Sequence, residues 1–402
     1  MKLRINPSRA MGRVSAPPSK SMAHRLLICA ALCEGVSVVR GVSSCEDVLA
    51  TLDCIESLGV RYEKQGNDIT VYGKDITSAV PTGALNCRES GSTLRFMIPI
   101  ALLSGMTTLF YGAPSLMSRP MGVYEELCAS HGLTYITDGK SIAVKGKLTG
   151  GEYELVGNIS SQFISGLLFA LPLCEENSKI KITTAIESRS YIDMTLKAIS
   201  SFGIIVEWED EHTLSIPGGQ RYVARDISVE GDWSGTAFIE AFNLFGGKVE
   251  IDGLYPESIQ GDKIYRRFYE MLSLGVPTIH IGDCPDLGPV LFAVSSALCG
   301  GIFSGTKRLK IKESDRAAAM AEELSKFGVL VTVHDDAVVV YPADFHAPKE
   351  PLSGHNDHRI VMALSVLLSI KGGEIEGAEA VSKSYPGFFD DLRALGIEVT
   401  EI

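Results

Sequence analysis

The sequence has no apolar run long enough to cross a membrane. Its most hydrophobic stretches, residues 163–173 and 289–299, fall short of the roughly 18 consecutive apolar residues that a spanning helix needs. The first residues, MKLRINPSRAMGRV, carry charges with no apolar stretch after them, so we expect no secretory signal. These absences predict a cytoplasmic protein with no membrane partner.

The nine cysteines include no C-x-x-C pair and no spacing typical of a metal site. Cys33, Cys174 and Cys299 each end an apolar run just before the chain turns, where small buried side chains are expected. No Ser–His–Asp arrangement is suggested either. We therefore expect reduced, buried thiols, and a reaction that uses no metal and no cofactor.

Basic residues are in the minority, with 37 Lys and Arg against 49 Asp and Glu and a net charge of −12. Nucleic acids and anionic membranes require a basic face, so neither is expected as a partner. No G-x-G-x-x-G turn or Walker A sequence is present, and nucleotide folds of those types are not supported. An acidic chain of 402 residues, long enough for two domains, can still bind a small anion where its cations are concentrated.

A repeated pattern runs through the chain. Six times, a polar loop leads into a helix-length apolar run, a Gly or Asn, a short strand, a second loop and an amphipathic helix. The apolar runs start roughly 70 residues apart, except for a gap nearer 55 before the fifth. The pattern predicts an α/β fold of six repeats, three per domain, with a crossover near residues 225–231. The first strand has no repeat of its own and could pair with either half.

Each second helix ends at a glycine that is followed by β-branched residues. A glycine there suits the left-handed position that terminates a helix. The six predicted positions are Gly59, Gly132, Gly203, Gly275, Gly328 and Gly396.

Cations and hydroxyls gather in the loops before the repeated helices, where free N–H groups and the positive end of the helix dipole favour anions. In repeat one, Lys20 stands between Ser19 and Ser21, and Arg25 follows one turn later. A helix cap would explain the serines alone, but the added cations favour an anion site.

In repeat two, Gly91 lies between Ser90 and Ser92 and allows close approach of a ligand, although turn geometry alone would also explain it. Arg95 follows one turn later. Arg119 precedes a helix start, where it is unfavourable with the dipole unless an anion is its partner.

In repeat three, Ser160, Ser161 and Gln162 open a helix, and Ser188 lies in the second loop. These groups could hold a polyhydroxylated or phosphorylated ligand, although simple N-capping is the favoured explanation when this loop is taken alone.

Repeats five and six add carboxylates to the cations. Asp286 opens a helix, where it could be only a cap, and the loop KIKESDR places Lys312, Glu313 and Arg316 together. Asp286 and Glu313 are the best candidates for proton transfer, since acid–base chemistry needs carboxylates beside cations that tune them. Repeat six contributes Arg359, beside His358, and Lys383 in its second loop.

Nine motifs, PSKSMAHR, ESGSTLR, SRPMG, SSQF, ESRSYID, CPDLGPV, KESDR, NDHR and KSYPGFF, occur in this order over essentially the whole chain. In this they resemble the 5-enolpyruvylshikimate-3-phosphate synthases (3-phosphoshikimate 1-carboxyvinyltransferases) of the enolpyruvyl transferase family. The resemblance implies six βαβαββ-type repeats in two domains that close like a clamshell on ligands. One domain would span residues 16–228, and the other would comprise residues 1–15 and 229–402, so that the first strand joins the C-terminal half. A monomer is expected.

The resemblance also implies a reaction, the transfer of the enolpyruvyl group of phosphoenolpyruvate to the 5-hydroxyl of shikimate-3-phosphate through a tetrahedral intermediate. Phosphate is released in this step of aromatic amino acid biosynthesis. Asp286 would take the hydroxyl proton, and Glu313 and Lys20 would serve the other proton transfers. Shikimate-3-phosphate would contact Lys20, Ser21, Arg25, Ser160, Ser161, Gln162, Ser188, Asp286 and Lys312. Phosphoenolpyruvate would contact Lys20, Gly91, Arg119, Gln162, Arg316, Arg359 and Lys383, and glyphosate is the expected inhibitor.

Two positions depart from the family pattern, because Glu89 and Arg308 stand where relatives often have Asn. The main alternative is the transferase that acts on UDP-N-acetylglucosamine, which usually carries a reactive Cys in the loop that corresponds to residues 112–121. No Cys occurs there. A non-catalytic repeat protein that binds anions is a second alternative. An enzyme that processes RNA ends fits poorly with the acidic charge.

Overall fold

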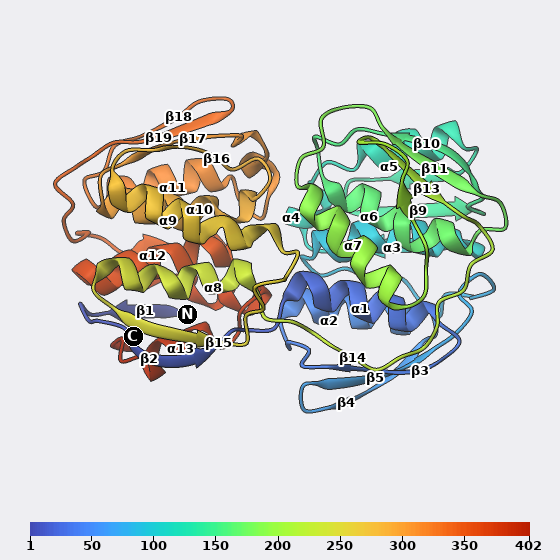
Figure 1. Ribbon diagram of the computed structural model, residues 1–402, viewed down its shortest axis with the longest axis horizontal. Coiled ribbons are helices and arrows are strands. Elements are labelled where there is room, and N and C mark those ends of the chain that lie inside the picture. The colour runs from blue at the N-terminus through green and yellow to red at the C-terminus, as the bar shows by residue number, and fades with distance from the viewer. The chain divides into compact units, whose positions relative to one another are not determined.

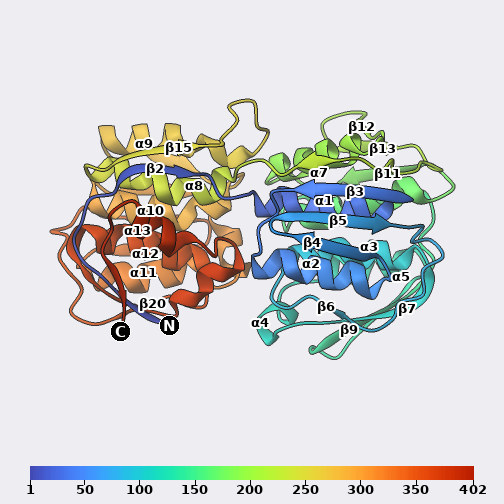
Figure 2. The ribbon, with the colours of Figure 1, turned by 90° about the horizontal axis from the view of Figure 1, so that it is seen from below.

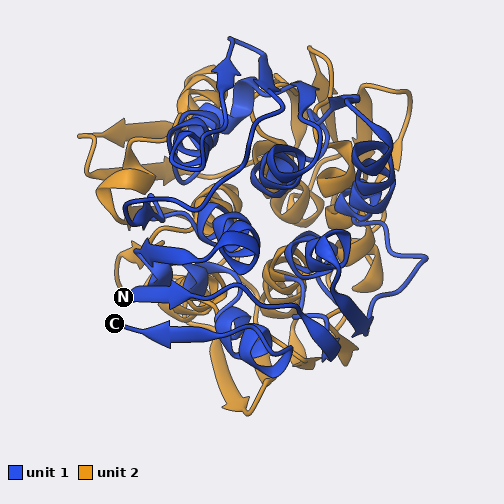
Figure 3. Ribbon diagram, turned by 90° about the vertical axis from the view of Figure 1, so that its left-hand side faces the viewer, with its two compact units in different colours: residues 1–19, 231–402 blue, residues 20–230 orange.

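The computed structural model describes residues 1–402 and divides into two compact units (Figure 3). Unit 1 consists of residues 1–19 and 231–402, and unit 2 consists of residues 20–230. Each unit has its own cluster of buried apolar side chains. No helix combines the length and the apolar character that crossing a membrane requires.

Unit 2 contains three four-stranded sheets of one design. In each, the first two strands are parallel and the third and fourth are antiparallel to their neighbours. Their orders are β14 (Ile227–Ser228), β3 (Gly35–Arg40), β5 (Asp68–Gly73), β4 (Arg61–Gln65); β6 (Leu85–Asn86), β7 (Gly105–Tyr111), β9 (Ser141–Gly146), β8 (Thr134–Thr137); and β10 (Gly151–Leu155), β11 (Ser178–Ile182), β13 (Thr213–Ile216), β12 (Glu207–Trp208). Figure 2 shows the first of these sheets with β3, β5 and β4 side by side.

Unit 1 contains two four-stranded sheets of the same design and one sheet of only two parallel strands. Its sheets are β16 (Thr278–His280), β17 (Gly301–Ser304), β19 (Ala337–Val340), β18 (Val331–Val333); β20 (Leu352–Ser353), β21 (Gly373–Glu376), β1 (Lys2–Ile5), β22 (Val399–Glu401); and the parallel pair β15 (Lys248–Asp252), β2 (Met11–Ser15). The six small mixed sheets confirm the predicted α/β fold of six repeats.

Each repeat places one almost fully buried helix and one amphipathic helix against its sheet. The buried helices are α1 (Lys20–Leu32), α3 (Gly91–Leu102), α6 (Ser161–Ala170), α8 (Trp233–Glu240), α10 (Gly288–Ala297) and α12 (His358–Lys371). The amphipathic helices are α2 (Glu46–Ser57), α5 (Gly122–Ser130), α7 (Arg189–Ser201), α9 (Tyr265–Leu274), α11 (Arg316–Ser325) and α13 (Phe388–Ala394). Short segments complete the chain: α4 (Pro114–Met117), η1 (Leu171–Leu173), η2 (Ala241–Phe245), η3 (Gly261–Ile264), η4 (Pro285–Leu287), η5 (Lys307–Ile311) and η6 (Ala378–Lys383). In unit 2, α1, α2, α3, α6 and α7 contact one another in a closed ring (Figure 1).

The fourth repeat is shorter than the others, because it has no antiparallel hairpin after α9. Its sheet consists of β2 and β15 alone, whereas every other repeat adds two antiparallel strands. The missing hairpin explains the short gap before the fifth apolar run. The expectation of six equivalent repeats therefore holds for the helices and fails for the strands of this repeat.

Five of the six predicted helix-ending glycines lie in the left-handed region, with φ between 66° and 87°. Gly275 is the exception, because it follows α9 with φ 156° and ψ −149°. The chain there continues directly into β16 instead of turning into a hairpin, so a left-handed residue is not needed.

The first strand lies in unit 1. β1 pairs antiparallel with both β21 and β22, so Leu3 lies opposite Ile375 on one side and Glu401 on the other. The N- and C-terminal strands are neighbours in this sheet (Figure 3). Residues from the two ends of the chain are therefore needed to complete one sheet.

Burial of the cysteines follows the prediction with one exception. Eight of the nine are buried free thiols, including Cys33 and Cys174. Cys299 is exposed, because α10 ends at Ala297 and the residue lies in the turn before β17. The expectation that Cys299 is buried was wrong.

Candidate active site

The start of α1 in unit 2 carries an ion pair. Lys20, the first residue of the helix, donates to Asp47 Oδ2 at 3.0 Å, and both side chains are largely buried. Asp47 lies in the first turn of α2. An acidic residue in that position is ordinary in a helix, because it complements the dipole, and nothing in the sequence therefore marked it.

Arg25 ties α1 to α7. Its guanidinium donates to the carbonyl of Ser21 at 2.6 Å, to the carbonyl of Tyr191 at 2.9 Å and to Thr195 Oγ1 at 2.8 Å. Burial lowers the pKa of Arg25 to about 10, which leaves it charged at neutral pH. The predicted anion ligands Lys20, Ser21 and Arg25 thus lie within two turns of one helix.

Two guanidinium groups converge on Gly91, the first residue of α3. A Cβ atom at this position would lie 2.8 Å from Nη1 of Arg119 and 3.2 Å from Nη1 of Arg95. Ser90 caps the helix by accepting from the N–H of Thr93. The glycine therefore leaves space at a helix start that faces two cations, an arrangement that suits an anion.

Gln162 joins the starts of α3 and α6. Its amide oxygen accepts from Nη1 of Arg95 at 2.7 Å, and its amide nitrogen donates to Ser92 Oγ at 2.8 Å. Ser160 is the N-cap of α6, as simple capping predicted, and Ser161 is buried at the first position of the helix. The structure thus brings Gly91, Arg119 and Gln162 together, with Arg95 as the link.

Four residues other than glycine have positive φ in the whole chain: Arg88, Ser188, His355 and Asn356. Arg88, His355 and Asn356 lie in loops that lead into helices with predicted site residues, and Ser188 is itself a predicted site residue. Left-handed backbone is unfavourable for such side chains and is typical of functional loops. Residue type gave no sign of it at Arg88 and Ser188, whereas His and Asn adopt this conformation more often than most residues other than glycine.

A buried chain of hydrogen bonds connects the first three helices of unit 2. His24 Nδ1 lies 2.7 Å from Thr51 Oγ1, which lies 2.7 Å from Thr93 Oγ1, and Thr93 donates to Ser90 Oγ at 2.8 Å. All four side chains are buried. Burial, followed by the charges of Lys20 and Arg25, lowers the pKa of His24 well below its usual value.

The depressed pKa of His24 predicts how the free energy of unfolding depends on pH. Because the folded-state pKa of His24 is depressed, its stabilising contribution is complete above the unfolded pKa of about 6.5 and is lost as the pH falls. We expect the free energy of unfolding of the wild-type protein to fall more steeply between pH 7 and pH 5 than that of His24→Gln, by up to about 1.4 kcal/mol per pH unit. Urea unfolding at several pH values measures both slopes, and equal slopes would contradict the prediction.

Asp286 is the centre of the site in unit 1. It lies in η4, and its side chain makes ion pairs instead of a helix cap. Its Oδ1 accepts from Lys312 Nζ at 3.2 Å and from Arg316 Nη1 at 2.8 Å, and its Oδ2 accepts from Arg359 Nη2 at 3.0 Å. Three cations from separate loops and helices therefore hold one carboxylate.

Arg316 is buried and contacts two further carboxylates. Its Nη2 donates to Glu313 Oε2 at 2.7 Å and its Nε to Asp357 Oδ2 at 2.8 Å. Burial alone would lower the pKa of Arg316, but the charges of Asp357, Glu313 and Asp286 outweigh it and raise the pKa. Burial lowers the pKa of Lys312, whereas Asp286 opposes that shift. The predicted residues of repeat five thus form one network with Arg359.

The side chain of Lys383 binds a main-chain carbonyl just before the start of α12. Its Nζ donates to the carbonyl oxygen of Asn356 at 2.6 Å, and Asn356 directly precedes Asp357, the N-cap of α12. Every site residue predicted in repeats five and six therefore lies at or beside the starts of α11 and α12.

Asp262 in η3 is a buried carboxyl that the sequence gave no reason to select. Burial, then the charge of Asp286, raises the pKa of Asp262 to about 6, while Arg359 acts in the opposite direction. Asp232, the N-cap of α8, raises it further. The acidic groups of repeat four are therefore electrostatically coupled to the Asp286 network.

One group of side chains has the composition of a metal site. Ligand atoms of Glu322, Glu323 and His355 lie within 4.8 Å of one another. The positive charge there is already supplied by Lys326, whose Nζ lies 3.0 Å from Glu323 Oε2. Since 32 residues separate Glu323 from His355, no local spacing could reveal this group.

The two positions that depart from the family pattern differ in their surroundings. Arg308 is buried in η5 and donates to the carbonyl of Gly282. Glu89 is half-buried and directly precedes the N-cap of α3.

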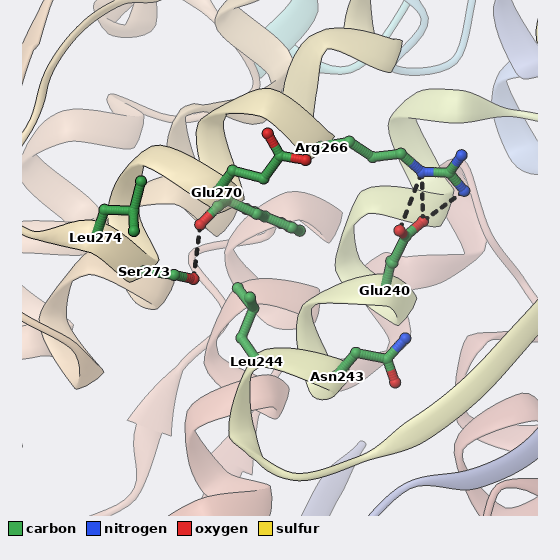
Figure 4. A pocket seen from close by; sticks show the side chains of 8 residues that line it. Glu240, Asn243, Leu244, Arg266, Glu270, Ser273 and Leu274 are labelled. Atoms are coloured by element: carbon green, nitrogen blue, oxygen red, sulfur yellow. Dashed lines mark hydrogen bonds and ion pairs between the residues drawn. The ribbon is translucent and has the colours of Figure 1, made fainter.

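An open pocket of about 560 Å³ lies between η2 and α9 of unit 1 (Figure 4). Arg266 and Glu240 form an ion pair on one side, and the exposed Leu274 lies on the other. None of the predicted site residues lines it. It is separate from the candidate active site.

Known proteins resemble the chain over its full length. A family model described as EPSP synthase (3-phosphoshikimate 1-carboxyvinyltransferase) matches residues 5–276 and 265–392. The 3-phosphoshikimate 1-carboxyvinyltransferase of Clostridium kluyveri is 40% identical over 99% of this chain and 98% of its own length. The 3-phosphoshikimate 1-carboxyvinyltransferase of Clostridium botulinum strain Eklund 17B is 37% identical over 98% of this chain and 97% of its own length. The structure of EPSP synthase from Acinetobacter baumannii superposes with a TM-score of 0.79, 23% identity and complete coverage of both chains, which supports the fold.

The full-length matches to the family model and to the curated relatives define the class of the chain, a carboxyvinyltransferase. The chain belongs to the EPSP synthase family.

Proposed function

We propose that this chain transfers the enolpyruvyl (carboxyvinyl) group of phosphoenolpyruvate to the 5-hydroxyl of shikimate-3-phosphate and releases phosphate, a step in aromatic amino acid biosynthesis. The membership of the EPSP synthase family supports this reaction. The observation that carries the proposal is the network of Asp286 with Lys312, Arg316 and Arg359, since it combines a proton acceptor with cations that balance anionic substrates.

In unit 1, Asp286 accepts the proton of the 5-hydroxyl, and the freed oxygen attacks C2 of phosphoenolpyruvate. Lys312, Arg316 and Arg359 orient the carboxylate of Asp286, because each donates to one of its oxygens. Arg316 and Arg359, together with Lys383, bind the phosphate and carboxylate of phosphoenolpyruvate. Guanidinium groups suit both anions, because they can donate two parallel hydrogen bonds.

Unit 2 carries the other proposed ligand groups. Lys20 and Arg25 neutralise anionic groups of shikimate-3-phosphate. Its oxygens accept hydrogen bonds from Ser160, Ser161, Gln162 and Ser188. Gly91 and Arg119 hold phosphoenolpyruvate at the start of α3, where the helix dipole and two guanidinium groups favour its negative charge.

The reaction proceeds by addition and elimination. Attack at C2 is coupled to protonation of the methylene carbon, which becomes a methyl group in a tetrahedral intermediate. Loss of a proton from this methyl group and departure of phosphate then restore the double bond in the product. We assign these two carbon proton transfers to Glu313 and Lys20. Glu313 is held by Arg316, and Lys20 by Asp47.

Release of inorganic phosphate tests the proposal directly. The protein is mixed with shikimate-3-phosphate and phosphoenolpyruvate, and phosphate and the enolpyruvyl product are measured together by a colorimetric assay and mass spectrometry. We expect equal amounts of both. Release only with UDP-N-acetylglucosamine, or with neither acceptor, would contradict the proposal. No observation favours that second acceptor.

Gly91→Ala is expected to weaken phosphoenolpyruvate binding with little effect on folding. The added Cβ would lie 2.8 Å from Arg119 Nη1, the mobile end of a long side chain, so the guanidinium must move away. We expect KM for phosphoenolpyruvate to rise about tenfold, equivalent to about 1.4 kcal/mol. Gly122→Ala is the matched control, because Gly122 also begins a helix and an added Cβ meets nothing within 4 Å. Equal effects of the two substitutions would argue against this role of Gly91.

Glyphosate is expected to compete with phosphoenolpyruvate at the cations beside Gly91, and the same substitution should raise its inhibition constant. Steady-state inhibition that excess phosphoenolpyruvate does not relieve would refute this. Because every proposed ligand group comes from one chain, we also propose that a monomer is active, which sedimentation of the working enzyme measures. The free thiols fit the reducing cytoplasm as the place of action.

A further inference from the structure

The loop between β20 and α12 contains two consecutive left-handed residues. His355 has φ 47° and Asn356 has φ 51°, and neither is a glycine. Such a backbone persists only where the surrounding contacts hold it. The loop carries the carbonyl that binds Lys383 and leads directly to Asp357, so its conformation sets the position of several proposed ligands.

Glu323, two turns inside α11, provides the contacts that hold this loop. Its side chain is fully buried, with Oε1 2.9 Å from His355 Nε2 and Oε2 accepting from the N–H of Ser353 at 2.9 Å. The N–H of His355 in turn donates to Ser353 Oγ at 3.2 Å. One buried carboxylate therefore fixes both the end of β20 and the first left-handed residue.

The charges around Glu323 favour an ion pair with His355. The hydrogen bond to Glu323 raises the pKa of His355. Burial opposes ionisation of Glu323, but its contacts with His355, Ser353 and Lys326 outweigh burial and lower its pKa. Both shifts favour the charged forms of His355 and Glu323.

The start of α11 also binds this loop, in addition to Glu323. Arg316, the first residue of α11, binds Asp357 at the other end of the loop. The helix that carries Arg316 therefore fixes the loop at both ends, and the carbonyl of Asn356 that accepts from Lys383 lies between these two attachments.

We infer that Glu323 and His355 are positioning residues that hold the left-handed loop, and with it Lys383 and the start of α12, in place for phosphoenolpyruvate. This inference rests on the proposed function for the identity of the ligand. Neither residue needs to contact a substrate, since the effect passes through the backbone of residues 355–357.

The test separates the side-chain contact from backbone strain. His355→Gly removes the contact but adopts a left-handed backbone more easily than histidine. Glu323→Gln retains the shape of the side chain and removes its charge. His334→Gln is the control, because His334 is an exposed histidine in a turn of unit 1. We expect KM for phosphoenolpyruvate to rise about tenfold in the first two variants, with kcat and KM for shikimate-3-phosphate within about twofold of wild type.

Restoring a donor should restore the function. We expect His355→Gln, whose amide can still donate to Glu323, to recover most of the loss seen in His355→Gly. Unchanged KM values in His355→Gly and Glu323→Gln, or a fall in kcat without a change in KM, would overturn the inference.

A readout independent of turnover keeps the inference separate from the proposed function. Lys383 is buried and held by Asn356, so its reaction with an amine-acylating reagent is expected to be slow in the wild type and several-fold faster in His355→Gly and Glu323→Gln. Peptide mass spectrometry measures the modified fraction in the folded protein. An inactive wild type with faster labelling of the variants would refute only the proposed substrates. Equal labelling in all variants would refute the positioning role.

Discussion

Asp286→Asn is expected to abolish nearly all phosphate release while the protein remains folded. The asparagine has the size of the carboxylate but cannot accept the proton of the 5-hydroxyl. General-base catalysis is typically worth about 10²- to 10⁴-fold, and we expect kcat to fall within or beyond that range. The cations that surround Asp286 then face a neutral amide, so a small loss of stability accompanies the kinetic effect.

The experiment compares phosphate release, thermal unfolding and shikimate-3-phosphate binding. Asp335→Asn is the control, because Asp335 is an exposed partner of Lys310 in the same unit. We expect the control to keep wild-type turnover, since exposed ion pairs contribute at most about 1 kcal/mol. Turnover of Asp286→Asn within a few-fold of the wild type would exclude Asp286 as the base.

Arg316→Met is expected to have the largest effect on stability. The side chain is buried among Asp286, Glu313 and Asp357, and its removal leaves these carboxylates without their shared cation. Breaking a buried ion pair by removing one partner typically costs about 3–5 kcal/mol. We expect a loss of that size in the free energy of unfolding, together with loss of activity.

Urea unfolding measures this loss, with Arg4→Met as the control. Arg4 on β1 pairs with Glu374 on β21 and the side chain of Arg4 is half-exposed, so its removal should cost at most about 1 kcal/mol. Adding Asp357→Asn to Arg316→Met should recover part of the loss, because one uncompensated charge is then removed. If Arg316→Met and Arg4→Met destabilise the protein equally, the buried network is not what stabilises this region.

The repeat was predictable because its signals are local. Apolar runs, capping residues and glycines act within one or two turns, and Ser90, Ser160 and Asp357 do cap the helices that follow them. The α/β class and the clustering of cations at helix starts followed from the same signals. Local signals failed at Cys299 and Gly275, since the exposure of Cys299 and the backbone conformation of Gly275 depend on how the chain continues after the helix has ended.

The rest of the site depends on contacts between residues far apart in the chain. Asp47 pairs with Lys20 across 27 residues, and Glu323 with His355 across 32. Neither acidic residue is unusual in its own helix. The left-handed backbone at Arg88 and Ser188 likewise depends on tertiary contacts, because the intrinsic preference of these residues opposes it.

The position of β1 between β21 and β22 determines the order in which the chain can fold during synthesis. Unit 2 consists of one continuous segment, so all of its residues have left the ribosome once residue 230 has emerged. The sheet of β1 needs residues 399–401 and must wait until these residues have been made. Domains generally fold as they are completed, from the N-terminus onward. Here residues 231–402 of unit 1 are made after unit 2, so β1 is made before unit 2 but finds its partner strands only after it.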